Sequence, residues 1–344
     1  MPGSLGESVL WVSKQDVRDS SWWRRQNPDL VILGLWTRPK YDSVRRAVLR
    51  VTPNLIERAD SDGMRTASCG LKPYARRRFD YCRDLTAGWS PLISPFVSFL
   101  YSATSVLATP WLEHRLARTL SLIPRLVVET PGAADLWHAL SLHLRVSSCP
   151  IQQIAHPVQT SLFQFQPNDR KSNRVVAVGR WGSYQKNLPA LLTALREFLR
   201  QFPDWEAEVV GAGLPDRSPI DRCQFTPAVP PHELAQCFRS SKILLFSSRY
   251  ESFLLAGAEA LTAGCSVLGP VSSVSTDYFR SFFADHPIPE NASSLAGSLG
   301  LESKAWAMGR RDPAKISFHA LREFSPIAVA QRFLAGMPAF ASLS

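Results

Sequence analysis

Two glutamates with a regular spacing, Glu251 and Glu259, stand eight residues apart in a segment built as strand, turn, helix and strand. The apolar run Ile243–Phe246 predicts a buried strand, and the residues from Glu251 to Ala263 predict a helix that ends at Gly264. Ligands of parallel α/β sheets bind beyond the carboxyl ends of strands, at helix N-termini. The sequence therefore predicts Glu251 at the mouth of a site and Glu259 about two turns further along the helix.

The spacing of the two carboxylates restricts the chemistry that they can do together. Eight residues of helix span roughly 12 Å, whereas the two carboxyl groups of a glycosidase lie roughly 5 to 9.5 Å apart. A hydrolytic pair on one helix is therefore not expected. Two interpretations stay open: carboxylates that bind hydroxyls on two parts of one long ligand, or two solvated glutamates on an amphipathic helix.

A cationic turn lies upstream, between an apolar run that ends at Val178 and a helix-forming run that begins at Leu188. It carries Gly179, Arg180 and Lys186. A planar guanidinium, an ammonium and the amides of a helix N-terminus suit a phosphate group. A solvated basic turn is the alternative.

Three segments in this order carry a resemblance to a known family. VGRW with QKN (178–187), VVGAG (209–213) and SSRYESFLLAGAEALTAGCSVLG (247–269) resemble the C-terminal, nucleotide-sugar-binding domain of family-4 retaining glycosyltransferases of the GT-B fold. The resemblance covers residues 174–270 and extends more loosely to 322–335, which is similar to the tail helix of those enzymes.

The resemblance implies an α/β fold of two Rossmann-like domains that face each other across a cleft, with an atypical or shortened N-terminal domain. The expected parts are an acceptor-side domain (1–165), a nucleotide-sugar-binding domain (166–325) and a tail helix that returns to the first domain (326–344). The function implied is transfer of a sugar, with retention, from a nucleotide diphosphate sugar. The enzyme class is hexosyltransferase, with a UDP-, GDP- or ADP-sugar as donor substrate and no further cofactor.

Site roles follow from the resemblance residue by residue. It implies that Arg180 and Lys186 neutralise the diphosphate, that Glu251 lies at the sugar and that Glu259 binds the ribose. Backbone groups around the phosphate and sugar would come from Gly179, Phe253, Leu254 and Leu255. Fixed cations and amides of the protein beside the departing diphosphate would make a metal unnecessary, and the C-terminal half has no Asp-x-Asp cluster.

Two positions depart from the family pattern. Leu254 stands where a glycine is common, and the gap from Arg180 to Lys186 is one residue longer than usual. We expect these changes to affect sugar preference.

The N-terminal half departs further. Only Gly3 and Gly6 lie near the start, so the usual glycine-rich acceptor loop is expected to be absent or replaced. Asp60 and Asp62 stand where the family often keeps a catalytic histidine. They are assigned here to the substrate side of the site, with a metal-binding Asp-Ser-Asp and a solvated loop as open interpretations.

Residues further along this half are expected near the cleft. Glu129 and Thr130 follow the strand-forming run Arg125–Val128 and should face the cleft. His156 lies where such chains cross between domains, and it is interpreted as a hinge or core residue in preference to a base.

Composition fits two domains in a chain of 344 residues. Six cysteines without CxxC spacing and the absence of a signal sequence predict reduced thiols in the cytoplasm. The net charge is +10, and residues 1–165 hold 20 Lys/Arg against 13 Asp/Glu. No nucleic-acid-binding motif accompanies this charge, so an anionic membrane surface or a phosphorylated acceptor is expected.

A long uncharged run follows Arg76, Arg77 and Arg78 and extends from Leu85 to Leu112. Three interpretations are open: ordinary core, contact with a membrane interface, and a membrane span. The acceptor, whether glycan, lipid-linked or small molecule, is not disclosed. The alternative function is a non-catalytic nucleotide-sugar-binding partner subunit with a remodelled N-terminal domain, and a phosphorylase is disfavoured because nothing resembles a pyridoxal-phosphate lysine site.

Overall fold

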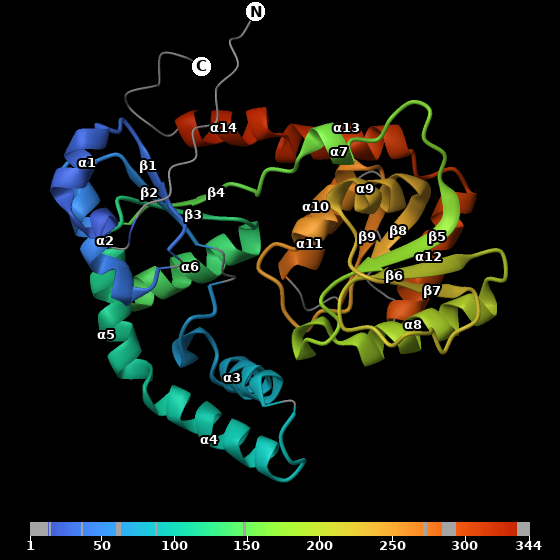
Figure 1. Cartoon of the computed structure of the whole chain (residues 1–344), viewed down its shortest axis with the longest axis horizontal. Helices are drawn as coiled ribbons and strands as arrows, with labels where there is room; N and C mark the ends of the chain where they lie inside the picture. The colour runs from blue at the N-terminus through green and yellow to red at the C-terminus, as the bar shows by residue number, and fades with distance from the viewer. Residues whose placement is uncertain are drawn as a thin grey trace, which may run out of the picture.

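The structure, a computed structural model, describes residues 13, 15–35, 37–59, 63–86, 88–146, 149–270, 274–283 and 294–335. It contains two parallel sheets, one from each half of the chain, with helices around each (Figure 1). We call the part from η1 to β4 the N-terminal lobe and the part from β5 to α13 the C-terminal lobe. The prediction of two Rossmann-like halves is confirmed.

The C-terminal lobe is a five-stranded sheet in the order β7-β6-β5-β8-β9 with every pairing parallel. Its elements are β5 (Ser172–Val178), η4 (Tyr184–Lys186), α8 (Leu188–Gln201), β6 (Glu206–Val210), β7 (Cys223–Thr226), α9 (Pro231–Ser240), β8 (Ser241–Leu245), α10 (Leu255–Thr262), β9 (Ser266–Leu268), α11 (Val274–Arg280), η5 (Ser281–Phe283), α12 (Leu295–Ala307) and α13 (Pro313–Phe324).

This sheet forms because its central strands are continuous apolar runs, as expected for strands covered on both faces. The side chains of Val176 in β5 and Leu245 in β8 are fully buried. Helix α8 buries Leu191, Leu195 and Phe198, which recur at helical spacing, against the same core. The order places β5 and β8 side by side, and the chain leaves them toward opposite edges of the sheet.

The N-terminal lobe has a four-stranded parallel sheet in sequence order, β1-β2-β3-β4. Its elements are η1 (Asp16–Arg18), α1 (Ser20–Gln26), β1 (Val31–Leu33), η2 (Pro39–Tyr41), α2 (Asp42–Leu49), β2 (Leu55–Arg58), η3 (Ala67–Cys69), α3 (Leu71–Leu85), α4 (Ile93–Leu107), α5 (Thr109–Leu120), β3 (Arg125–Val128), α6 (Pro131–His143) and β4 (Ile151–Gln153). The short α7 (Thr160–Phe163) lies on the crossing to the second lobe.

The last helix, α14 (Pro326–Ala335), belongs to the core of the N-terminal lobe. Right-handed crossovers that all step in one direction place their helices on one face of a sheet. On that face of the N-terminal sheet, Leu126 and Val128 of β3 pack with Trp137 of α6. Val127 points to the other face and clusters with Phe333 of α14. Figure 1 shows α13 and α14 running end to end above both lobes.

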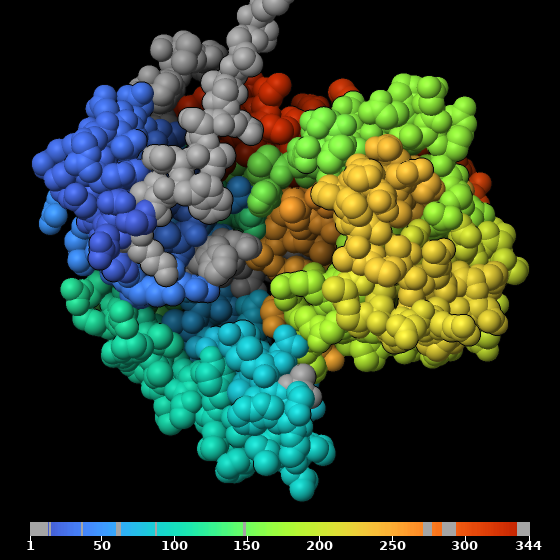
Figure 2. Space-filling view, viewed as in Figure 1, coloured from blue at the N-terminus to red at the C-terminus, as the bar shows by residue number. Residues whose placement is uncertain are grey.

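Helices α3 and α4 form an antiparallel hairpin that projects from the N-terminal lobe (Figures 1 and 2). Among the residues that the structure describes, no helix combines the length and the apolar composition that crossing a bilayer requires. The uncharged run 85–112 is divided between the hairpin turn, α4 and the start of α5, so its interpretation as a membrane span is wrong.

Candidate functional site

The site lies at the point where the strand order of the C-terminal sheet reverses, between β5 and β8. The loops that leave the carboxyl ends of these strands separate here, which opens a crevice for a ligand. The first loop carries the cationic turn and the second carries Glu251. Topology thus brings together two motifs that are far apart in the sequence.

A cavity of about 540 Å³ lies in this crevice. The C-terminal lobe lines it with most of the predicted site residues, namely Gly179, Arg180, Lys186, Glu251, Phe253, Leu254 and Leu255. The N-terminal lobe contributes Glu129, and the crossing segment contributes His156. In Figure 2 the orange-brown surface around α10 and α11 lies between the blue and green N-terminal lobe and the yellow-green C-terminal lobe.

An ion pair joins the two charged motifs inside the cavity. The ammonium of Lys186 lies 2.5 Å from Oε1 of Glu251, and both side chains are largely buried. The side-chain amide of Gln185 donates to the carbonyl of Tyr250 at 2.9 Å and so fixes the same loop. Arg180 is exposed at the cavity and has no ion-pair partner among the described residues. One cation is therefore positioned by Glu251 and the other is open to an anionic ligand.

The cationic turn is held by close packing of two glycine loops. The amide of Trp181 donates to the carbonyl of Ala212 at 2.7 Å. A Cβ on Gly211 would lie 1.8 Å from the carbonyl oxygen of Gly179, and one on Gly213 would lie 2.4 Å from the amide nitrogen of Gly182. Both Gly211 and Gly213 also have positive φ. The VVGAG motif is therefore a backing surface for the turn that carries Arg180 and Lys186.

Helix α10 begins later than the sequence predicts. Glu251 lies in the preceding loop, and the helix starts at Leu255 because Leu254 takes the left-handed conformation, with φ 66° and ψ 74°. The 12 Å separation along one helix is therefore wrong for these two glutamates. Leu254 shows why a glycine suits this position, since a left-handed backbone strains a bulky residue. No side chain caps the helix, so its first amides are available to a ligand.

Glu259 lies inside α10 and does not line the cavity. Burial of its carboxyl, which favours the neutral form, raises the pKa of Glu259 to about 7. The structure therefore brings Glu251 together with Arg180 and Lys186, and Glu259 is not among the residues that line this cavity. Asp60 and Asp62 lie outside the described residues. Within the part of the chain that is described, no group of three or more His, Cys, Asp or Glu residues could hold a metal ion.

The N-terminal side of the cavity has two polar groups that are held in place. The carboxylate of Glu129 is buried and accepts an ion-paired hydrogen bond from Arg58 at 2.7 Å. The ring of His156 stacks on Phe253 with 6.2 Å between centroids, and its Nδ1 lies 2.9 Å from the carbonyl of Pro157. The expectation that Glu129 faces the cleft is confirmed, and His156 is part of the cavity wall. The same expectation is wrong for Thr130, which is buried and whose hydroxyl accepts a hydrogen bond from the amide of Ala133 at the start of α6.

A contact between the lobes was missed in the sequence. The carboxylate of Asp84, at the end of α3, accepts a hydrogen bond from the amide of Tyr184 at 2.5 Å and one from the hydroxyl of Ser183 at 3.3 Å. The guanidinium of Arg77 lies 4.5 Å from the ring centre of Tyr250. We call this set the latch, because it ties α3 to the two loops that carry Lys186 and Glu251.

The latch also changes the interpretation of the triple arginine. Arg76 pairs with Asp80 at 3.1 Å, Arg77 lies on Tyr250, and Arg78 bonds to the hydroxyl of Tyr101. Each of the three side chains therefore contacts a group of the protein, and the side chain of Arg76 is still 65% exposed.

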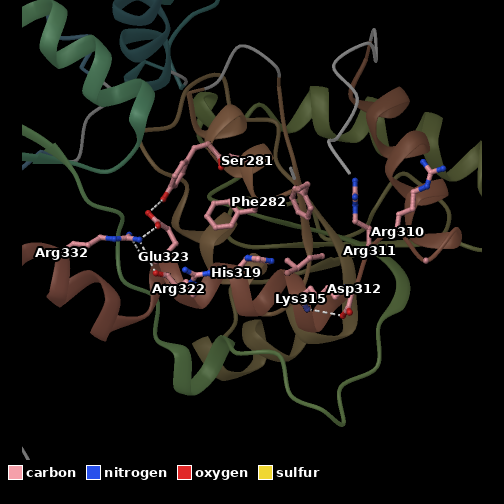
Figure 3. Close-up of a pocket in the computed structure, with 14 residues that line it drawn as sticks. Ser281, Phe282, Arg310, Arg311, Asp312, Lys315, His319, Arg322, Glu323 and Arg332 are labelled. Carbon is pink, nitrogen blue, oxygen red and sulfur yellow. Dashed lines mark hydrogen bonds and ion pairs between the residues drawn. The ribbon is translucent and has the colours of Figure 1, made fainter. Parts of the chain in front are cut away.

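A second cavity, of about 610 Å³, lies beside α13 and α14 (Figure 3). Two of its arginines already have carboxylate partners, Arg311 with Glu302 and Arg332 with Glu323. None of its lining residues follows the carboxyl end of β5 or β8. The arrangement of strand ends therefore favours the first cavity as the functional site.

Comparison with known protein families gives a match over one part of the chain. Residues 158–296 match the family Glycosyl transferases group 1. A search of curated protein sequences found no match.

Several solved structures have a similar fold. They include the pneumococcal O-GlcNAc transferase GtfA in complex with UDP and GlcNAc (TM-score 0.56, 13% identity, 91% of this chain and 58% of that chain). Sucrose-phosphate synthase from Thermosynechococcus elongatus has TM-score 0.56 and 13% identity over 97% of this chain and 82% of that chain. Anabaena HepE in complex with UDP and glucose has TM-score 0.55 and 11% identity over 92% of this chain and 81% of that chain.

The lengths differ among these structures. The chain spans 46% of a chain in the GtfA/B complex and 58% of GtfA. At these identities the likeness shows the fold, which is GT-B: two Rossmann-like halves that face each other across a cleft.

Proposed function

We propose that the protein transfers a sugar from a nucleotide diphosphate sugar to an acceptor, with retention of configuration. The match of residues 158–296 to the family Glycosyl transferases group 1, in a chain of GT-B fold, supports this proposal. The observation that carries this proposal is the pairing of Lys186 with Glu251 at the switch point of the C-terminal sheet, beside the open Arg180. Residues 166–325 take the donor in this proposal, and residues 1–165 take the acceptor.

The charges of the cavity suit the departure of a diphosphate. When the bond from the anomeric carbon to the phosphate oxygen breaks, negative charge grows on the diphosphate and positive charge on the sugar ring. Arg180, Lys186 and the first amides of α10 stabilise the leaving group. Glu251 holds the ammonium of Lys186 in position and lies on the sugar side. We propose that no metal is required, which an assay in the presence of EDTA tests.

The acceptor enters from the N-terminal lobe in this scheme. Glu129 and His156 line the same cavity as the cationic turn, and each is oriented by a contact of its own. They therefore supply polar groups near an acceptor hydroxyl.

The test is release of nucleoside diphosphate from a panel of UDP-, GDP- and ADP-sugars with candidate acceptors, followed by two substitutions. Lys186→Ala and Arg180→Ala should each lower kcat/KM. The decrease should correspond to a loss of roughly 2 to 4 kcal/mol of transition-state stabilisation. Arg196→Ala, an exposed arginine on α8, is the matched control. Unchanged kinetics in both site variants contradicts the phosphate assignment. Nucleotide binding without turnover on any donor supports the non-catalytic subunit instead.

A further inference from the structure

An ordinary packed helix buries its large apolar side chains, whereas α4 buries small side chains and exposes large ones. Ser94, Ser98 and Ser102 face α3 and are buried, and the hydroxyl of Ser102 donates to the carbonyl of Ala75 at 2.7 Å. The large side chains face outward: Phe96 and Phe99 are 63% and 64% exposed. The helix therefore packs on the protein through serines and presents its apolar face to the outside.

This face continues along one side of the hairpin, and we call it the apolar stripe. It is formed by Trp89, Leu92, Ile93, Phe96, Phe99, Leu100, Leu107 and Trp111, all exposed. No charged residue occurs between Asp84 and Glu113. Figure 1 shows α4 at the edge of the molecule farthest from both sheets, and Figure 2 shows the hairpin projecting there. Contiguous apolar surface of this kind marks an interaction site.

The groups at the two ends of the stripe indicate what covers it. Trp89 and Trp111 lie near its ends, and tryptophan is favoured where an apolar phase meets water. Arg83 is exposed beside the first end, and the guanidinium of Arg115 lies 4.7 Å from the ring centre of Trp111 at the second.

The acidic neighbours of these arginines are turned toward the protein. Asp84 bonds to the amide of Tyr184, and Glu113 lies 3.2 Å from the imidazole of His143. The outer surface at both ends of the stripe is therefore cationic.

From these observations we propose that the apolar stripe docks on the surface of an anionic phospholipid bilayer, with α4 lying in the plane of the interface. A charge-free apolar face, flanked by tryptophan and arginine, matches the requirements of an interfacial helix. The proposal does not rest on the proposed glycosyl transfer, because it needs only the hairpin. It assigns Arg83 and Arg115, at the two ends of the stripe, to the lipid charge, in addition to Arg76–Arg78.

The test is flotation of the full-length protein with vesicles of phosphatidylcholine alone or with about one-third phosphatidylglycerol. We expect binding to the anionic vesicles at about 0.15 M salt, and weaker binding as salt is raised. The double variant Phe96→Gln, Phe99→Gln should lose about tenfold or more of this binding. Phe318→Gln, on α13 and 60% exposed, is the matched control and should bind as the wild type does.

The charges are tested separately. Arg83→Gln with Arg115→Gln should reduce binding to anionic vesicles and its dependence on salt, whereas Arg196→Gln should change neither. Calorimetry of every variant checks the fold: Phe96, Phe99 and Arg83 are exposed and their substitution should leave the thermal midpoint unchanged, and Arg115 is only partly buried. Equal binding by the Phe96, Phe99 variant and the wild type overturns the proposal. So does a dimer in light scattering that this variant dissociates while vesicles recover no protein, because a second copy then covers the stripe.

Discussion

At the scale of single residues, the pairing of Lys186 with Glu251 divides the roles of the two glutamates more sharply than their spacing does. Glu251 is in the cavity with the cations, and Glu259 is in the body of α10. We expect Glu251→Gln to leave affinity for the bare nucleoside diphosphate nearly intact and to lower single-turnover rates by about 10²-fold or more. For Glu259 we keep the ribose-binding role that the family resemblance implies. Glu259→Gln should then weaken binding of the nucleotide, because the amide has one acceptor oxygen where the carboxyl group has two.

Calorimetry with the nucleoside diphosphate and single-turnover kinetics measure the two effects on both variants. Identical profiles for Glu251→Gln and Glu259→Gln contradict this division of roles. No effect of either substitution supports the non-catalytic subunit.

The carboxyl of Glu259 should also make stability depend on pH. Burial raises its pKa in the folded state to about 7 from an ordinary 4.5. Between these values the folded protein holds a proton that the unfolded chain has released, so the unfolding free energy falls as pH rises through this window. The loss is at most about 3.4 kcal/mol, at 1.36 kcal/mol per pKa unit.

Urea unfolding of the wild type and Glu259→Gln at pH 5 and pH 8 tests this dependence. The stability of the variant relative to the wild type should rise with pH, because glutamine has no proton to lose. A constant difference between the two proteins shows that the carboxyl is ionised throughout.

At the scale of elements, the latch couples helix α3 to the donor loops. Asp84 accepts two hydrogen bonds from the turn that carries Lys186, and bonds to a charged acceptor contribute about 1.5 to 3 kcal/mol. Asp84→Ala should therefore loosen the turn, raise the donor KM and increase hydrogen exchange at the amide of Tyr184. Asp216→Ala, an exposed acidic residue of the C-terminal lobe, is the control. A donor KM equal to that of the wild type, with unchanged exchange, shows that the turn is held without α3.

Local patterns predicted those elements whose apolar residues all face one core. The run Val175–Val178 and the helix from Leu188 lie as the pattern indicates, with the strand extending back to Ser172. Strand β7 was missed because Cys223–Thr226 is a short edge strand with a polar interior position. The start of α10 was missed because it depends on the left-handed backbone of Leu254, which propensity does not favour for leucine.

The site was predictable to the extent that each motif carries its own chemistry. Arg180, Lys186 and Glu251 could be singled out by residue type and order, and they line one cavity. The latch could not be predicted, since Asp84 and Tyr184 are joined by the packing of two lobes, and no local sequence pattern records that contact.

At the scale of the whole molecule, the two lobes share one C-terminal helix. The crossover helices cover one face of the N-terminal sheet, and the other face is covered by α14, which reaches it after the C-terminal lobe is complete. Arg125 of β3 donates to the carbonyl of Phe333 at 3.0 Å and ties the end of α14 to the sheet. The N-terminal lobe therefore cannot complete its core until the end of the chain is in place.

This arrangement predicts that a substitution in the buried face of α14 destabilises the N-terminal lobe in particular. Phe333 is buried against the N-terminal sheet, so Phe333→Ala should cost about 3 kcal/mol or more of unfolding free energy through lost burial and a cavity. Ile327→Ala, on the same helix but 72% exposed, should cost less than about 0.5 kcal/mol. Hydrogen exchange should rise in β2 and β3 of the Phe333 variant while β5 and β8 keep their protection. Equal loss of protection in both sheets contradicts a helix that stabilises the N-terminal lobe, because it shows that the two lobes unfold as one unit.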